Sequence, residues 1–191
     1  MNGPDRDRDL MARAAVGDRG AFTELMDRHE DMVFAVAMRM MRDREAAFDA
    51  TQETFLTLFR KADRYSGESS VSTWLYRVAT NTCLDLLRKQ KRRRAEALPE
   101  HHDEPDHRAA EPFDAVEVRP DIEAALASIP TDFRAAVVLS DIHGLSIAEI
   151  GDILEVPPGT VKSRVFRGRR LLAEKLGNLT EYPGRPRTDD A

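Results

Sequence analysis

Apolar residues in the first half of the chain recur at spacings of three and four, which is the repeat of helices with one buried face. This repeat predicts four helices, over residues 10–16, 19–41, 43–62 and 71–92. Gly17 and Asp18 separate the first two, and a loop around Gly67 precedes the fourth. The sequence has no clear segment with the alternating apolar and polar pattern of a β-strand, so we expect an all-α fold.

The second half predicts two short helices, over residues 120–128 and 130–142, and then a helix-turn-helix over residues 146–170. Ser146 and Glu149 have the spacing of a capping box, which starts a helix. Val156-Pro157-Pro158-Gly159 breaks the chain, and Pro158 suits the first turn of the next helix. That helix is rich in Lys and Arg, as a helix that enters the DNA major groove is. A helical hairpin with a solvated basic face is the alternative interpretation.

Residues 98–118 contain three prolines, many carboxylates and almost no apolar periodicity, so they should not pack a core. A chain of 191 residues can hold two small domains. We therefore expect a four-helix domain at 1–95, a flexible acidic linker at 96–119, a helix-turn-helix domain at 120–177 and a disordered tail at 178–191.

The net charge of −5 hides an uneven distribution. Residues 60–94 contain ten basic and three acidic side chains, and residues 158–175 contain six basic and one acidic. Residues 95–123 contain ten acidic and two basic side chains. Two basic blocks that suit nucleic acid are thus separated by an acidic one.

The sequence has no long apolar run and no signal-peptide pattern, so we expect a cytoplasmic protein without membrane insertion. Its single cysteine, Cys83, excludes an internal disulfide; a buried structural role is favoured over redox sensing. His101, His102 and His107 lie in the linker without a framework of further ligands, so we expect no metal and no cofactor.

Two patterns in the first domain suggest binding surfaces. Asp49, Gln52 and Glu53 form a polar stripe on the third helix, although a solvated helix face would look the same. Around the start of the fourth helix, the aromatic residues Tyr65 and Trp74 alternate with basic ones. Rings that stack on unpaired bases beside cations that neutralise phosphates are typical of single-stranded nucleic-acid binding.

The segments DATQETFLTLFRKADRYSGESSVSTWLYRVATNTCLDLLRKQKRR and IPTDFRAAVVLSDIHGLSIAEIGDILEVPPGTVKSRVFRGRRLL, in this order, resemble the extracytoplasmic-function (ECF) sigma factors. This family is group IV of the main bacterial sigma factors and carries sigma regions 2 and 4. The resemblance covers residues 10–176. It implies a binding subunit without catalytic residues that gives RNA polymerase promoter specificity, helps to melt the DNA and is controlled by an anti-sigma factor.

The resemblance also implies roles for particular residues. On core polymerase, the expected partners are the coiled coil of the largest subunit and the flap. The expected contacts with core polymerase are made by Asp49, Gln52, Glu53, Phe55 and Leu58. Binding of the promoter −10 element is expected from Tyr65, Ser69, Ser70, Trp74, Arg77 and Asn81. Binding of the −35 element in the major groove is expected from Thr160, Lys162, Ser163, Arg164, Phe166 and Arg167.

Phe48 departs from the family pattern, which often has an acid there. From the residues alone, two other functions stay open. A stand-alone helix-turn-helix regulator would bind a palindromic duplex without polymerase. A hydrolase built on the linker histidines would need a nucleophile or metal-ligand constellation that the sequence does not display.

Overall fold

The computed structural model describes residues 4–97 and 120–177, and every regular element in these ranges is a helix. The expected all-α fold with two helical domains is confirmed. Residues 98–119 and 178–191, with the linker histidines and the predicted tail, lie outside the described residues. None of the helices in the described part of the chain is long and apolar enough to cross a membrane.

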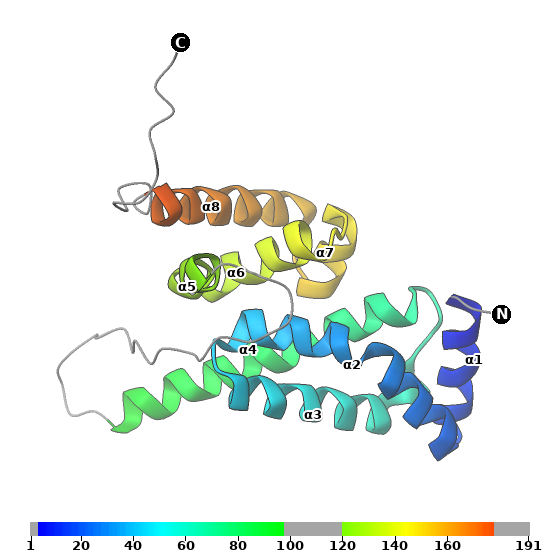
Figure 1. Ribbon diagram of the computed structural model, residues 1–191. Coiled ribbons are helices and arrows are strands. Elements are labelled where there is room, and N and C mark those ends of the chain that lie inside the picture. The colour runs from blue at the N-terminus through cyan, green and yellow to red at the C-terminus, as the bar shows by residue number, and fades with distance from the viewer. Residues whose placement is uncertain (1–3, 98–119, 178–191) are drawn as a thin grey trace, which may run out of the picture.

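The first domain consists of α1 (Pro4–Ala15), α2 (Arg19–Met41), α3 (Arg44–Lys61), a 3-10 turn η1 (Ala62–Arg64) and α4 (Val71–Ala97). Figure 1 shows α2, α3 and α4 lying along one another with α1 across one end. Asp18 and Asp43 fix the starts of α2 and α3, because each carboxylate accepts a hydrogen bond from the backbone N–H three residues on, at 3.0 and 3.1 Å. Gly17 allows the tight turn before α2 with φ of 92°.

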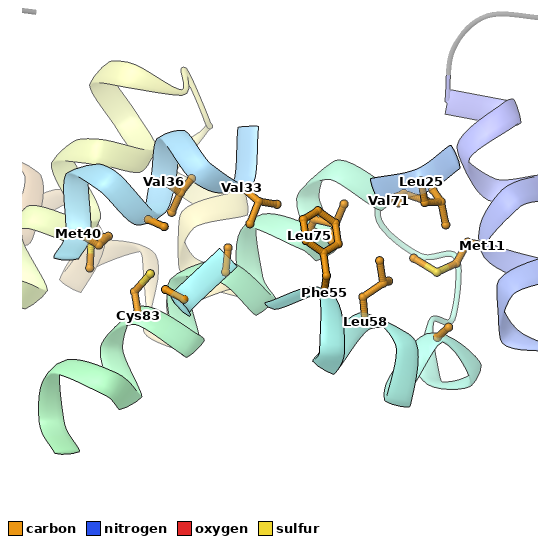
Figure 2. Packing of buried hydrophobic residues seen from close by; sticks show 14 of the residues in the cluster. Met11, Leu25, Val33, Val36, Met40, Phe55, Leu58, Val71, Leu75 and Cys83 are labelled. Atoms are coloured by element: carbon orange, nitrogen blue, oxygen red, sulfur yellow. The ribbon is translucent and has the colours of Figure 1, made fainter. Parts of the chain in front are cut away.

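The core of this domain lies between α2, α3 and α4, as Figure 2 shows. Leu25, Val33 and Met40 of α2 are each at most 1% exposed, and they belong to one apolar cluster with Leu58 of α3 and Leu75 of α4. Full burial of a side chain of this size stabilises the fold by about 1.5–3 kcal/mol. The apolar faces predicted from the three-and-four repeat therefore hold the domain together.

Two helices of the first domain differ in extent from the sequence prediction. The first begins at Pro4 instead of residue 10, since a proline and two following acids favour a helix start. Asp7 on the added turn binds Arg28 and His29 of α2, at 2.7 and 3.1 Å. At the other end, α4 continues to Ala97, so residues 96 and 97, expected in the linker, are helical.

The second domain consists of α5 (Pro120–Ser128), α6 (Thr131–Val137), a π turn η2 (Val138–Ile142), α7 (Ile147–Leu154) and α8 (Pro158–Gly177). The predicted helix over 130–142 is thus α-helical only to Val137. The N–H of His143 donates to the carbonyl of Val138 at 3.1 Å, five residues back. A π turn differs from an α-helix in its hydrogen-bond register, and five residues are too few for an apolar repeat to distinguish the two.

Tight packing of α6 against α8 organises the second domain. A Cβ atom at Gly168 would lie 2.5 Å from Cγ2 of Val137 and 3.2 Å from the carbonyl oxygen of Phe133. Only a glycine allows the two helices to approach this closely. Gly168 was not among the residues predicted to be important, although it continues the spacing of Val161 and Val165 along the buried face of α8.

The two domains lie against each other. Helix α4 packs on α7, and α2 packs on α5 and α6 (Figure 1). Ala135 and Leu154 of the second domain join the apolar cluster of the first, and Tyr76 of α4 packs against the cluster of the second. The sequence predicted both domains but not this arrangement.

Candidate nucleic-acid interfaces

The loop between η1 and α4 is held by its own side chains. The hydroxyl of Tyr65 donates to the carbonyl of Ser69 at 2.5 Å. The hydroxyl of Ser70 accepts a hydrogen bond from the N–H of Thr73 at 3.0 Å, which satisfies a free donor at the start of α4. The rings of Tyr65 and Trp74 meet edge to face, with centroids 6.2 Å apart. The predicted −10 residues of this loop therefore have defined positions.

An open groove of about 1090 Å³ runs between α3 and α4. It brings together members of both sets of residues predicted for the first domain, whereas Tyr65, Ser69 and Ser70 are not among its lining residues. From α3 it is lined by Asp49, Gln52, Glu53 and Leu56. From η1 and α4 it is lined by Arg64, Trp74, Arg77, Asn81 and Lys89. Aromatic, basic and amide side chains thus face one cavity, and the acidic stripe forms its other wall.

Two residues of the predicted polymerase contact lie in the core of the domain. Phe55 and Leu58 are 4% and 0% exposed and belong to the core, so neither can touch a partner while the domain stays folded. Leu56, which the sequence analysis did not select, is 46% exposed and lies beside Gln52 and Glu53 in the groove wall. The apolar repeat of α3 identifies Phe55 and Leu58 as inward-facing, and that was the available signal.

Phe48 forms a separate exposed aromatic site on α3. Its ring packs on Phe34 of α2 with centroids 4.8 Å apart, and the guanidinium of Arg44 lies 5.3 Å from its centre. At 45% exposure, one face of this ring remains open beside Asp49. The departure from the family pattern therefore replaces an exposed charge by an exposed apolar surface.

The helix-turn-helix is formed as predicted. The hydroxyl of Ser146 accepts the N–H of Glu149 at 3.2 Å, and the Glu149 carboxylate accepts the N–H of Ser146 at 2.8 Å, which lowers the pKa of Glu149. Helix α7 ends at Glu155, which has the left-handed φ of 54°. Pro158 then begins α8.

One face of α8 is exposed along its length. Val161 and Val165 are buried, while Phe166 is 68% exposed. Exposed residues of the predicted −35 set share that face: Lys162, Ser163, Phe166 and Arg167. Thr160 is half-buried at the start of the helix. An exposed phenyl ring between cations is costly in water, and it suits a contact with a thymine methyl group.

Other basic residues of α8 are engaged within the domain. Arg164 pairs with Asp132 of α6 at 3.1 Å. Arg169 binds Asp141 through two nitrogens, at 2.6 and 2.9 Å, and its hydrogen bond lowers the pKa of that carboxyl. Within the described residues, no ion pair involves Lys162 or Arg167. Lys175 in the last turn is likewise unpaired among the described residues, but within the predicted −35 set Lys162 and Arg167 are the cations most available to DNA, and Arg164 is less so than the sequence suggested.

Cys83 lies in the core between α2 and α4 and is 0% exposed (Figure 2). Burial raises the pKa of its thiol to about 12, so the reactive thiolate is scarce at neutral pH. The described residues also contain no group of three His, Cys, Asp or Glu side chains placed to hold a metal ion.

Comparison with known proteins assigns both domains. Residues 25–93 match the family Sigma-70 region 2, and residues 119–172 match the family Sigma-70, region 4. The chain is 38% identical to the ECF RNA polymerase sigma factor SigM of Mycobacterium tuberculosis, an alignment that covers 91% of this chain and 86% of that protein. It is 42% identical to SigE of Mycolicibacterium smegmatis, over 85% of this chain and 65% of that protein.

Solved structures show the same fold. The sigma factor RpoE of Bartonella quintana, in complex with the anti-sigma factor NepR, aligns with a TM-score of 0.65 and 24% identity over 82% of this chain and 96% of that one. CnrH, in complex with the cytosolic domain of CnrY, aligns with a TM-score of 0.63 and 26% identity over 91% of this chain and 98% of that one. The chain belongs to the ECF RNA polymerase sigma factors, a family of binding subunits and not of enzymes.

Proposed function

We propose that the first domain, residues 1–95, binds core RNA polymerase and the promoter −10 element, and that the second, residues 120–177, binds the −35 element. Residues 96–119 would join them and 178–191 would form a tail. The observation that carries the proposal is the groove between α3 and α4, in which an acidic stripe faces aromatic and basic side chains. Such a groove suits a protein that must hold polymerase and an unpaired DNA strand side by side.

The polymerase contact is assigned to the exposed side of α3. Asp49, Gln52 and Glu53 offer carboxylates and an amide, and Leu56 offers apolar area beside them. A polar rim around an apolar centre is the usual anatomy of a protein interface. The partner on the polymerase is the coiled coil of the largest subunit, and the flap is the expected partner of the second domain.

The −10 contact is assigned to the loop at 65–70 and the first turns of α4. Flipping a base out of the stack costs a few kcal/mol. Stacking on an aromatic ring returns about 1–3 kcal/mol per base, which Tyr65 and Trp74 can supply. Ser69 and Ser70 border this position, Arg77 neutralises a phosphate, and the amide of Asn81 can read a base edge. Capture of the flipped base would thus offset the cost of strand separation.

The −35 contact is assigned to the exposed face of α8 in the major groove. Lys162 and Arg167 can each donate to the O6 and N7 acceptors of a guanine, and Phe166 can touch a thymine methyl group. Ser163 is placed to bind a phosphate or a base edge, while Thr160 and the paired Arg164 would position the helix on the backbone. Reading two separated elements at once gives the factor its promoter specificity.

Control by an anti-sigma factor is the third part of the proposal. It is supported by the Bartonella RpoE structure, which contains the anti-sigma factor NepR. Such a partner would act by covering the polymerase or DNA surfaces described above. The protein would work in the cytoplasm, where the polymerase and the promoter DNA are found.

Run-off transcription with purified core polymerase tests the proposal. Wild-type chain should give transcripts from promoters of its own genome. Asp49→Lys should abolish co-purification with the polymerase, because it reverses a charge in the stripe. Asp31→Lys, the same change on an exposed part of α2, is the matched control and should remain active. Tight binding to a palindromic duplex without polymerase, and no transcript with it, would instead indicate a stand-alone regulator.

A further inference from the structure

Arg134 joins the two domains through a buried guanidinium. It lies on α6 and is 2% exposed. Its Nη1 donates to the carbonyl of Met40 at the end of α2, at 2.6 Å, and its Nη2 donates to the carbonyls of Ala127 and Ile129, at 3.0 and 3.1 Å. The carbonyls in the last turn of α2 lack partners within the helix, and they attract a cation.

This contact lacks the usual compensation for a buried charge. The acceptors of Arg134 are backbone carbonyls, its Nε is buried without a hydrogen-bond partner among the described residues, and Arg42 is a like charge nearby. Burial lowers the pKa of the guanidinium to about 10, so it is still charged at neutral pH. A charge held only by neutral dipoles loses much of its pairing energy to desolvation. The contact of Arg134 with Met40 therefore adds little net stability to the packing of the domains.

A second interdomain contact follows the π turn. Nδ1 of His143 lies 3.1 Å from the hydroxyl of Tyr76 on α4, and the two ring centroids are 4.9 Å apart. Arg39 on α2 is the charged group that faces His143 across the contact. On its own segment, the carboxylate of Asp141 is held by Arg169. Burial, and then the charge of Arg39, lower the pKa of His143 to about 4, so this arrangement accepts only the neutral ring.

The packed domains also obstruct the groove of the first domain. Glu155, which ends α7, lines the groove together with Arg77 and Asn81. A carboxylate at this point occupies space and positive potential that a DNA phosphate would use. The carboxylate repels a DNA phosphate, so the packed arrangement disfavours a DNA strand in the groove.

We propose that the contacts of Arg134 with Met40 and of His143 with Tyr76 form a latch that keeps the domains closed over the α3–α4 groove, and that protonation of His143 opens it. The effect on promoter binding rests on the proposed −10 role of α4; the opening itself does not. His143 has its ordinary pKa of 6.5 when exposed and about 4 when closed. The closed form is thus favoured above pH 6.5 and loses stability as the pH falls toward 4. Between pH 7.5 and 5.0 the ratio of open to closed chains should rise about 25-fold.

Distance measurements on the full chain test the latch. In a Cys83→Ala background, Arg88→Cys on α4 and Glu174→Cys on α8 place one exposed label on each domain. Pulsed electron paramagnetic resonance at pH 7.5 and 5.0 should show a longer distance gaining population at the lower pH. His143→Gln, which is neutral at both pH values, should remove this response, and His143→Lys should be open at both. Circular dichroism verifies that each variant keeps its helices.

The outcomes separate the latch from the proposed function. An unchanged distance distribution in the wild-type chain between the two pH values overturns the latch, and so does a pH response of His143→Gln equal to that of the wild type. In a parallel arm at pH 7.5, unlabelled His143→Lys should bind a mixed-sequence single-stranded 12-nucleotide DNA more tightly than the wild type. If the distances show opening but DNA binding does not improve, the latch stands and the −10 role of the groove fails.

Discussion

Replacing Gly168 by alanine would place a methyl group where α8 and α6 touch. The new Cβ atom would lie 2.5 Å from Cγ2 of Val137 and 3.2 Å from the carbonyl oxygen of Phe133. The Val137 side chain is 3% exposed, so it has little room to turn away, and the backbone oxygen cannot. The two helices must therefore move apart, or the Val137 side chain must leave its preferred rotamer.

The cost can be estimated from two opposing effects. Overpacking of a core by one methyl group costs about 1–3 kcal/mol. Exchange of glycine for alanine inside a helix returns about 0.8–1.0 kcal/mol. The difference spans about 0–2 kcal/mol, and the 2.5 Å approach to Val137 places this substitution in the upper half, at about 1–2 kcal/mol. For a domain of this size each kcal/mol lowers the melting temperature by about 4–8 °C, so we expect the transition that includes α8 to fall by about 4–16 °C.

Scanning calorimetry of the full chain would measure this change. Gly159→Ala on the same helix is the control, because its Cβ would have no neighbour within 4 Å, and it should leave stability unchanged or raise it. Val137→Ala removes the clashing atom, so the double variant should lose about 1 kcal/mol less than the sum of the single losses. A Gly168→Ala chain that melts with the wild type, or a strictly additive double variant, would refute this account of the α6–α8 contact.

Four further predictions concern single side chains. Ser146→Ala should lower the free energy of unfolding by about 1 kcal/mol in urea titrations. The hydrogen bond from the Ser146 N–H lowers the pKa of Glu149 below its ordinary value of 4.5. The stability that this hydrogen bond adds is therefore fully present above pH 4.5 and is lost as the pH falls through the lowered pKa of Glu149. Glu149→Gln should remove this part of the loss of stability in acid. Cys83 should resist iodoacetamide at pH 8 until the chain is unfolded, and alkylation of the native chain within minutes would contradict its burial. Arg167→Ala should weaken holoenzyme binding to a −35 duplex about 5- to 150-fold in filter-binding assays, whereas Lys175→Ala, exposed in the last turn of the same helix, should bind as the wild type does.

The helices of this protein are predictable because each one repeats its apolar residues over several turns and begins at a recognisable cap. The predicted capping box at Ser146 is confirmed, and Asp18 and Asp43 cap α2 and α3 in the structure. The π turn after Val137 and the early start of α1 were not predicted. The apolar repeat predicts which face of a helix is buried, but it does not predict the hydrogen-bond register within the helix. It also cannot predict a helical turn that is stabilised by a contact with another helix, such as that of Asp7 with His29.

The candidate sites, like the helices, could be predicted from the sequence only in part. Asp49 and Trp74 were selected for their chemistry and lie in one groove, but their proximity depends on how α3 packs on α4. Phe55 is buried, as its spacing along α3 predicts, whereas its expected role in the polymerase contact came from the resemblance to a family. The contact of Arg134 with Met40 joins residues 94 positions apart, so no local pattern can reveal it.

The position of Trp74 has a practical consequence. It is the single tryptophan of the chain, and it lines the α3–α4 groove next to Tyr65. Selective excitation of this indole therefore observes one place in the molecule, without a dye or a substitution. A base that stacks on the ring would quench its emission, and a partner that dries the groove would shift the emission to shorter wavelength. The intrinsic fluorescence of the unmodified protein is thus a time-resolved monitor of what enters the groove, from the first contact with polymerase to the capture of a melted strand.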